Sequence, residues 1–263
     1  MRDSIATADR RQVTIRHALS MTPGLEWHEN IPYTDPRNDE IVMTRSKDPV
    51  HYVLSRKAIS EPGKTWEYNG GMSQVLAAIV QRASGRPIRE YARSVLFDPL
   101  DIRDVEWVGD LAGMPSAASG LRLRPRDLAK FGSLYLHHGR WRERQVIPAD
   151  WVRESTRRRL LLPSPVNAFG TFGYAYHWWH TCYRSGWGTL ETWVAIGNGQ
   201  QRIFVLPELG LAVTVLAGRY NDPTASRLPD RLLLEHILPS AGRMSRMPQL
   251  AESTACAVVP ERK

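Results

Sequence analysis

The sequence predicts an α+β fold, in which an antiparallel sheet is flanked by helices and accompanied by a mostly helical region. Apolar residues recur at helical spacing through the first half of the chain, strand-like segments begin at Thr192, and one more helical segment closes the pattern. Runs of helices followed by runs of strands are typical of α+β proteins and not of parallel doubly wound folds. We expect the helices to group on one side of the sheet.

The central helix is expected to follow a tight turn at Pro62 and Gly63. Gly70 and Gly71 are predicted to give the backbone before this helix conformations that are closed to residues with a Cβ. Gly85 stands where glycine commonly ends a helix. Its buried face is predicted from apolar residues at near-helical spacing: Val75, Leu76, Ile79, Val80 and Ala83.

The remaining elements are predicted by the same signals of spacing, capping and termination. Thr14 is expected to cap a short helix that Pro23 stops, and residues 26–48 are expected to form a polar surface excursion. Further helices are predicted at 48–58, 87–97, 124–136, 148–155 and 227–238. Strands are predicted at 192–196, 202–206 and 211–217, with a hairpin connection at 207–210.

The chain is predicted to consist of a lead-in at 1–12, one domain at 13–239 and a disordered tail at 240–263. Neither a signal sequence nor an apolar run long enough to span a membrane is found, and the compartment stays unknown. Cys182 and Cys256 match no paired-cysteine pattern, so we expect free thiols.

The net charge of +8 favours anionic partners without proving one. Arginine clusters at 122–126 and 157–159 are interpreted as solvated faces, because basic residues are scattered through all segments and no nucleic-acid module accompanies them. Gly197 and Gly199 lack the third glycine and the following helix of a dinucleotide site. No cofactor and no nucleic-acid partner are therefore expected.

Several segments, taken in order, resemble the serine β-lactamase-like superfamily, specifically the group of class C β-lactamases, D-alanyl-D-alanine carboxypeptidases, esterases and aminohexanoate-oligomer hydrolases. The resemblance covers about Val13 to Leu238, and the ordered set is more specific than any single motif. The segments are 13–25, 62–71, 96–100, 119–129 and 197–205. It implies a β-lactamase/transpeptidase-like fold and hydrolysis of an ester or amide through an acyl-serine intermediate.

The resemblance places the family's catalytic tyrosine on Tyr68. Its implied role is to relay a proton between nucleophile and leaving group, which requires a phenolic pKa lowered by nearby positive charge. The Tyr-x-Asn pattern becomes Tyr68, Asn69 and Gly70 here, so glycine stands where an asparagine amide would bind substrate.

The family's Lys-Thr-Gly strand motif falls on Gly197, Asn198 and Gly199, without the lysine. The backbone N–H of Gln200 would then be one oxyanion donor. This departure and the one at Gly70 favour an esterase or amide hydrolase over a β-lactam-hydrolysing enzyme.

No Ser-x-x-Lys occurs anywhere in the 263 residues, so no nucleophile is assigned. Thr44 and Lys47 have the spacing with threonine but lie in the polar excursion, where we expect a solvated loop. The simplest interpretation is a chain that starts downstream of the nucleophile helix and of the first sheet strands. Marginal stability or self-association through an unpaired sheet edge would follow.

Two further groups of residues could belong to a functional site or could have a purely structural role. Trp178, Trp179 and Trp187 either line a substrate pocket or pack in the core, and the two readings are equally supported. His177 and His180 lack a third ligand for zinc, and His137 and His138 suit a helix end. No metal site is expected.

The function predicted is a β-lactamase-related serine hydrolase domain that is inactive on its own, with a small ester or amide as substrate in complete relatives. The alternative is a non-catalytic remnant of the same fold that binds a ligand or a partner.

Overall fold

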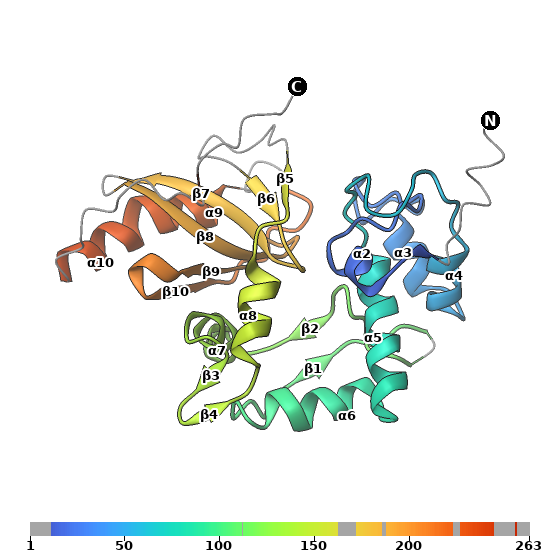
Figure 1. Cartoon of the computed structure of the whole chain (residues 1–263), viewed down its shortest axis with the longest axis horizontal. Coiled ribbons are helices and arrows are strands. Elements are labelled where there is room, and N and C mark those ends of the chain that lie inside the picture. Colours follow the sequence, from blue (N-terminus) through green and yellow to red (C-terminus); the bar gives the residue numbers. More distant parts are fainter. Residues whose placement is uncertain are drawn as a thin grey trace. The chain divides into compact units, whose positions relative to one another are not determined.

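The computed structural model describes residues 12–111, 113–162, 172–185, 188–222, 227–244 and 256. The chain divides into two compact units, Met1–Leu123 and Arg124–Lys263, and this division falls inside the single domain that the sequence predicts. Each unit has its own set of helices and strands (Figure 1). Among the described residues, no helix combines the length and the apolar character needed to cross a bilayer.

Unit 1 is mostly helical, and helix α5 lies at its centre. Its elements are α2 (Ile15–Leu19), α3 (Asp39–Thr44), α4 (Pro49–Ser55), α5 (Gly70–Ser84), α6 (Ile88–Ala92), the π-helical turn η2 (Arg93–Phe97) and two short paired strands, β1 (Glu106–Trp107) and β2 (Leu121–Arg122). Helix α5 packs against α2, α3 and α4. Its N-cap is Asn69, whose side chain accepts from the N–H of Met72, and it ends at Gly85 with φ of 66°. The predicted stop at Gly85 is confirmed.

The predicted surface excursion at 26–48 is wrong, because this segment contains α3 and several buried polar residues. Asp39 accepts from the N–H of His28 at 2.7 Å and from the hydroxyl of Tyr52. The side-chain amide of Asn38 donates to the carbonyl of Ile31 at 2.9 Å. These side chains are polar because they form hydrogen bonds inside the unit, with the backbone of their own segment and with Tyr52, and not because they face water.

Unit 2 is built around a six-stranded antiparallel sheet in which neighbours in sequence are neighbours in space. Its order is β10-β9-β8-β7-β6-β5. The strands are β5 (Leu160–Leu162), β6 (Phe172–Tyr174), β7 (Trp179–Ser185), β8 (Gly188–Ile196), β9 (Arg202–Leu206) and β10 (Leu211–Val215). The predicted strands correspond to the end of β8, to β9 and to β10. Strands β5, β6 and β7 are absent from the prediction.

The other elements of unit 2 are helices and one short hairpin. They are α7 (Pro125–Leu136), the hairpin β3 (Arg140–Trp141) and β4 (Arg144–Gln145), α8 (Ala149–Thr156), the 3-10 turn η3 (Pro207–Leu209), α9 (Leu228–Arg231), the π-helical segment η5 (Leu232–Ile237) and α10 (Leu238–Met244). The closing helix therefore continues six residues beyond its predicted end at Leu238, into the segment predicted to be a disordered tail. Residues 245–255 and 257–263 lie outside the described part.

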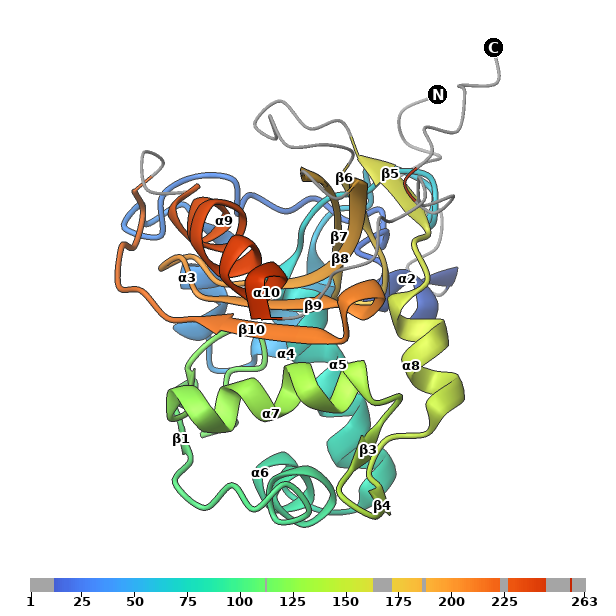
Figure 2. The same cartoon turned by 90° about the vertical axis from the view of Figure 1, so that its left-hand side faces the viewer.

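Helices cover both faces of the sheet in unit 2, whereas the sequence predicts them on one side. Ile203 and Val205 of β9 pack with Phe131 of α7, while Phe204 and Leu206 face Leu233 and Leu238. The two views show α7 and the α9–α10 helix on opposite sides of β9 and β10 (Figure 2). Because both faces of β9 are buried, its sequence is apolar without alternation after Arg202.

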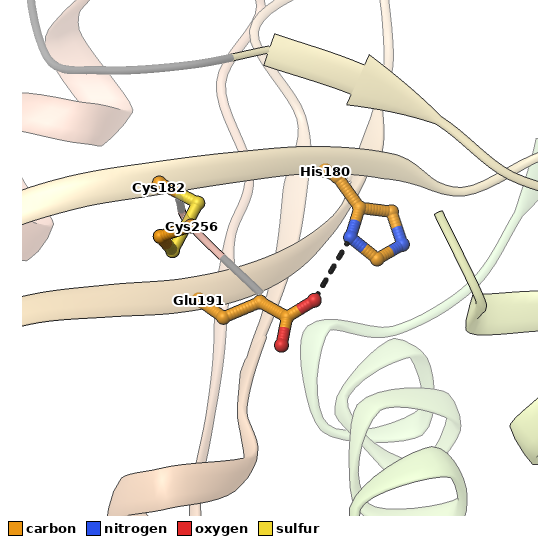
Figure 3. The surroundings of a disulfide bond; sticks show 4 residues. All are labelled: His180, Cys182, Glu191 and Cys256. Carbon is orange, nitrogen blue, oxygen red and sulfur yellow. Dashed lines mark ion pairs between the residues drawn. A yellow bond between two sulfur atoms is a disulfide. The ribbon is translucent and has the colours of Figure 1, made fainter. Parts of the chain in front are cut away.

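Cys182 and Cys256 form a disulfide, so the prediction of free thiols is wrong. Cys182 lies on β7, and its cross-strand neighbour on β8 is Glu191 (Figure 3). The Cα atoms of the two cysteines are 5.7 Å apart although 74 positions separate them in sequence. A spacing this long carries no local pattern, which is why the pairing is not visible in the sequence.

Candidate functional site

The turn before Tyr68 is held by backbone hydrogen bonds to the segment that follows α2. The N–H of Gly63 donates to the carbonyl of Thr22 at 2.8 Å, and the N–H of Glu67 donates to the carbonyl of Met21 at 3.0 Å. Gly63 has φ of 87°, which suits glycine at this tight turn. Tyr68 follows directly and precedes the N-cap of α5. As predicted, Tyr68 lies between the turn at Pro62 and Gly63 and the start of α5. The predicted buried face of α5 is wrong in part, because Ile79, Val80 and Ala83 are exposed.

The two glycines after the turn are required by close packing and not by unusual dihedral angles, which differs from the prediction. Neither has a positive φ. A Cβ on Gly71 would lie 2.6 Å from Cγ2 of Val53 and 2.7 Å from Cη2 of Trp27, and one on Gly70 would lie 3.0 Å from Oε2 of Glu29. Glycine therefore allows α5 to begin against these three side chains.

Glu29 connects the start of α5 to its surroundings. Its side chain is buried, with the residue only 6% exposed. Oε2 accepts from Nε1 of Trp27 and from the N–H of Gly70, both at 2.7 Å, and Oε1 accepts from the hydroxyl of Tyr33 at 2.7 Å. Three donors on one buried carboxylate make Glu29 the residue that fixes the beginning of the helix next to Tyr68.

Glu40 lies beside Glu29 and forms a buried carboxyl pair with it. Burial, followed by the negative charge of Glu29 and a hydrogen bond to it, raises the pKa of Glu40 to about 7. Two carboxyl groups can share a hydrogen bond only when one of them holds a proton. Glu40 is therefore the member of the pair that retains a proton in mildly acidic solution.

The surroundings of Tyr68 raise its pKa, which contradicts the predicted effect of a nearby cation. Burial makes the largest contribution, and the charges of Glu29 and Glu40 add to it. The charged groups that act on this phenol are thus carboxylates. At neutral pH Tyr68 carries its proton and can donate it, whereas accepting a proton would require a positive charge beside it.

The Glu29–Glu40 pair predicts a pH dependence of stability. Because the pKa of Glu40 is about 7 in the folded protein and near 4.5 in the unfolded chain, the folded state binds the extra proton between these values. The contribution of this proton to the free energy of unfolding is fully present below pH 4.5 and is lost as the pH rises through 7. The whole contribution is about 3 kcal/mol. Urea unfolding at pH 5 and pH 8 measures it.

The control variants for this pH dependence are Glu40→Gln, which cannot ionise, and Glu61→Gln at an exposed position. We expect Glu40→Gln to flatten the change between pH 5 and pH 8 and Glu61→Gln to leave it as in the parent protein. Equal pH profiles for all three proteins would show that Glu40 holds no extra proton.

The second predicted motif forms a closed turn between β8 and β9. The N–H of Gly197 donates to the carbonyl of Gln201 at 3.0 Å, and the N–H of Gln200 donates to the carbonyl of Gly197 at 3.1 Å. Gln200 has φ of 70°. The predicted oxyanion donor, the N–H of Gln200, is therefore already bonded within the turn. The donor role of Gln200 stays a prediction, and it would require this bond to open.

Two other amides of the same turn are open. No hydrogen bond from the backbone N–H of Asn198 or Gly199 is found to any described residue. The side chain of Asn198 donates to Oδ1 of Asn221 at 3.1 Å, and the carbonyl of Gly199 accepts from the N–H of Arg219 at 3.2 Å. Neither of these two amides is bonded within the turn, whereas the Gln200 amide cannot reach an anion without opening it. Asn198 is exposed and Gly199 is buried.

The tryptophans predicted to line a pocket have structural roles where they are described. Trp178 is buried among Ile203, Val205 and Tyr135, with ring centroids of Trp178 and Tyr135 4.5 Å apart. Trp179 stacks on Phe172 with centroids 4.8 Å apart. For Trp178 the core interpretation is supported. Trp187 lies outside the described residues.

The histidine candidates form no metal site within the described residues. Burial lowers the pKa of His177 to about 4. His180 is buried, with Nε2 against the carbonyl of Thr156 and Nδ1 3.2 Å from Oε1 of Glu191 (Figure 3). Nδ1 of His180 and Oε1 of Glu191 are close enough for an ion pair but are not aligned for a hydrogen bond.

The threonine and lysine that have the Ser-x-x-Lys spacing lie apart from these histidines in the sequence. Thr44 ends α3, where its hydroxyl donates to the carbonyl of Ile41 at 2.9 Å, and Lys47 is exposed.

The sequence of this chain matches a known protein family over residues 4–236, and that family is Beta-lactamase. The chain belongs to the Beta-lactamase family. Among curated proteins it is similar to the 6-aminohexanoate-dimer hydrolase of Paenarthrobacter ureafaciens, with 26% identity over 225 residues, 80% of this chain and 55% of the relative. The chain thus spans about half the length of this member of the family.

Solved structures agree with the Beta-lactamase fold. A Bacillus anthracis protein assigned to the 6-aminohexanoate-dimer hydrolases has a TM-score of 0.73 at 17% identity, covering 94% of this chain and 66% of that one. The octameric penicillin-binding protein homologue from Pyrococcus abyssi has a TM-score of 0.62 at 20% identity, covering 85% of this chain and 56% of that one. At these identities the similarity establishes the β-lactamase-like α+β fold.

Proposed function

We propose that this chain is a serine hydrolase domain for ester or amide bonds, in which the role of Tyr68 is proton transfer and that of the 197–201 turn is donation to an oxyanion. The observation that supports this proposal is the family match over residues 4–236, which includes both motifs in the family's order. The open amides of Asn198 and Gly199 support the oxyanion role, in place of the Gln200 amide.

The chemistry proposed for Tyr68 is donation of its proton to the leaving group. A phenol whose pKa is raised by burial and by two carboxylates holds its proton at neutral pH, which suits a general acid. In a relay the proton that Tyr68 donates is the one taken from the attacking serine, so Tyr68 would first have to lose its own proton and act as a phenolate. The lysine of a Ser-x-x-Lys motif is the kind of cation that would lower the pKa of Tyr68 enough for this.

The proposed substrates are small esters or amides. The support comes from two similar proteins, one named as a 6-aminohexanoate-dimer hydrolase from Paenarthrobacter ureafaciens and the other, similar in structure, as a D-amino acid amidase from Ochrobactrum anthropi. Gly70 and Gly197 replace the asparagine and the lysine that the family resemblance leads one to expect. A looser pocket for ester or amide substrates is therefore proposed over β-lactam specificity.

We further propose that these 263 residues do not form an acyl-enzyme by themselves, because they contain no Ser-x-x-Lys. The second candidate function is non-catalytic binding of a ligand or a partner by the same fold. The carboxylates beside Tyr68 favour this alternative, since they oppose the deprotonation that catalysis requires of the tyrosine.

The oxyanion role is tested by titrating the isotopically labelled chain with phenylphosphonate, whose tetrahedral oxygens resemble the charge of an acyl-transfer intermediate. We expect the amide resonances of Asn198 and Gly199 to shift with the ligand while that of Gln200 shifts less. Absence of any shift in the 197–201 turn at high ligand concentration would contradict the proposed oxyanion role.

A further inference from the structure

Arg202 is a buried cation that directly follows the 197–201 turn in the sequence, and no role is predicted for it from the sequence. It is the first residue of β9 and is only 6% exposed. An arginine is rarely buried unless its donors are satisfied, so its partners indicate why it is there.

The guanidinium of Arg202 donates hydrogen bonds to three acceptors of the turn. Nη1 donates to the carbonyl of Gly197 at 3.2 Å and to the carbonyl of Gln201 at 2.9 Å. Nη2 donates to Oε1 of Gln200 at 3.1 Å. Asp230, on α9, provides the negative charge that acts on Arg202, and its carboxylate also accepts from the hydroxyl of Tyr183. The planar fork of an arginine can hold these separate acceptors at once, which a single ammonium cannot.

The contact with the Gly197 carbonyl also determines where one of the open amides points. The carbonyl of Gly197 and the N–H of Asn198 belong to the same trans peptide, so they point in opposite directions. Fixing the carbonyl on Arg202 therefore directs the Asn198 N–H away from the guanidinium. A positive charge on the carbonyl side also polarises that peptide and strengthens its N–H as a donor.

We propose that Arg202 is a positioning residue, which holds the 197–201 turn closed and aims the amide of Asn198 at a bound anion. Arg202 itself does not touch the anion and acts through the Gly197 carbonyl. This inference rests on the proposed oxyanion role of the turn and deepens it.

The test compares Arg202→Gln and Arg202→Lys with Arg219→Gln in the phenylphosphonate titration. Arg219 is a matched control, because it is near the same turn and carries the same charge, but its side chain is 62% exposed and pairs with Asp222. We expect Arg202→Gln to raise the dissociation constant about tenfold, because the glutamine side chain is too short to reach the three acceptors. Arg202→Lys is expected to raise it nearly as much, because a single ammonium cannot bond the three separate acceptors at once. Arg219→Gln is expected to stay within about twofold.

An equal weakening in Arg202→Gln and Arg219→Gln would overturn the inference, because it would show a general effect of charge. Unchanged binding in Arg202→Gln would overturn it as well, while the oxyanion role itself would stand. If the amide resonances of Asn198 and Gly199 do not shift in the parent protein, the proposed oxyanion role is contradicted. The positioning role of Arg202 is then tested by the following measurement alone.

The unmutated chain provides a measurement that does not depend on the folding of the variants. A guanidinium held by three acceptors cannot rotate freely, so separate and slowly exchanging Nη resonances are expected for Arg202 by nitrogen NMR. Averaged Nη resonances like those of exposed arginines would overturn the clamp.

Discussion

Replacing Glu29 with alanine is expected to lower the free energy of unfolding of unit 1 by about 4 kcal/mol, because three donors lose one acceptor at about 1–3 kcal/mol each. The donors are Nε1 of Trp27, the hydroxyl of Tyr33 and the N–H of Gly70. Above pH 7, where Glu40 is ionised, relief of its repulsion with Glu29 offsets part of the loss. Urea unfolding followed by tryptophan fluorescence measures it, with Trp27 inside the affected region.

Glu29→Gln separates hydrogen bonding from charge in this prediction. One amide oxygen can still accept from two donors, but the amide NH₂ cannot accept from the third, so a loss of about 2 kcal/mol is expected. Glu61→Ala, at an exposed position, is expected to change the free energy by less than about 0.5 kcal/mol. If Glu29→Ala unfolds at the same urea concentration as the parent, Glu29 does not hold the start of α5.

Reducing the disulfide is expected to lower the stability of unit 2 by about 4 kcal/mol, as estimated from the chain entropy of a closed loop this long. The loop spans the 74 positions between Cys182 and Cys256 and includes strands β8, β9 and β10. Urea unfolding with and without dithiothreitol measures the change without altering the buried Cys182. A mass two hydrogens lower before reduction than after it confirms the bond.

The control for the disulfide prediction is a variant with serine at both positions, whose stability is expected to be insensitive to dithiothreitol. If the parent protein is equally stable with and without the reductant, or contains two free thiols as purified, then the bond does not stabilise unit 2.

The elements that could be predicted from the sequence are those whose signals are local. Helix α5 follows from apolar spacing and Gly85, and β9 from a short apolar run between turn residues. Tyr68 could be placed on its turn because Pro62, Gly63 and Asn69 lie within a few residues of it. Strands β5 to β7 could not be predicted, because none of them carries a local strand signal. Strand β5 is only three leucines long, and β6 and β7 mix aromatic residues with glycine and polar residues without a regular alternation.

The chemistry around Tyr68 could not be predicted, because its causes are distant in sequence. Glu29 reaches the N–H of Gly70 across 41 positions, and it reads as part of a polar loop until the fold is known. The same holds for the amides of the 197–201 turn. Which of them is open depends on the curvature of the backbone and on Arg202, and neither follows from the order of glycines.

Strands β5 and β10 are the edges of the described sheet, and each has a neighbouring strand on one side. Self-association of the protein through one of these edges stays a prediction.

Labelling of the purified chain with a fluorophosphonate probe, read by intact mass, tests most directly whether these residues hold the proton-transfer and oxyanion elements without a reactive serine. The account predicts no covalent adduct under conditions in which a known serine hydrolase is fully labelled. An adduct on any serine of the folded chain, lost when the protein is first denatured, would show that a nucleophile is present and would contradict the account.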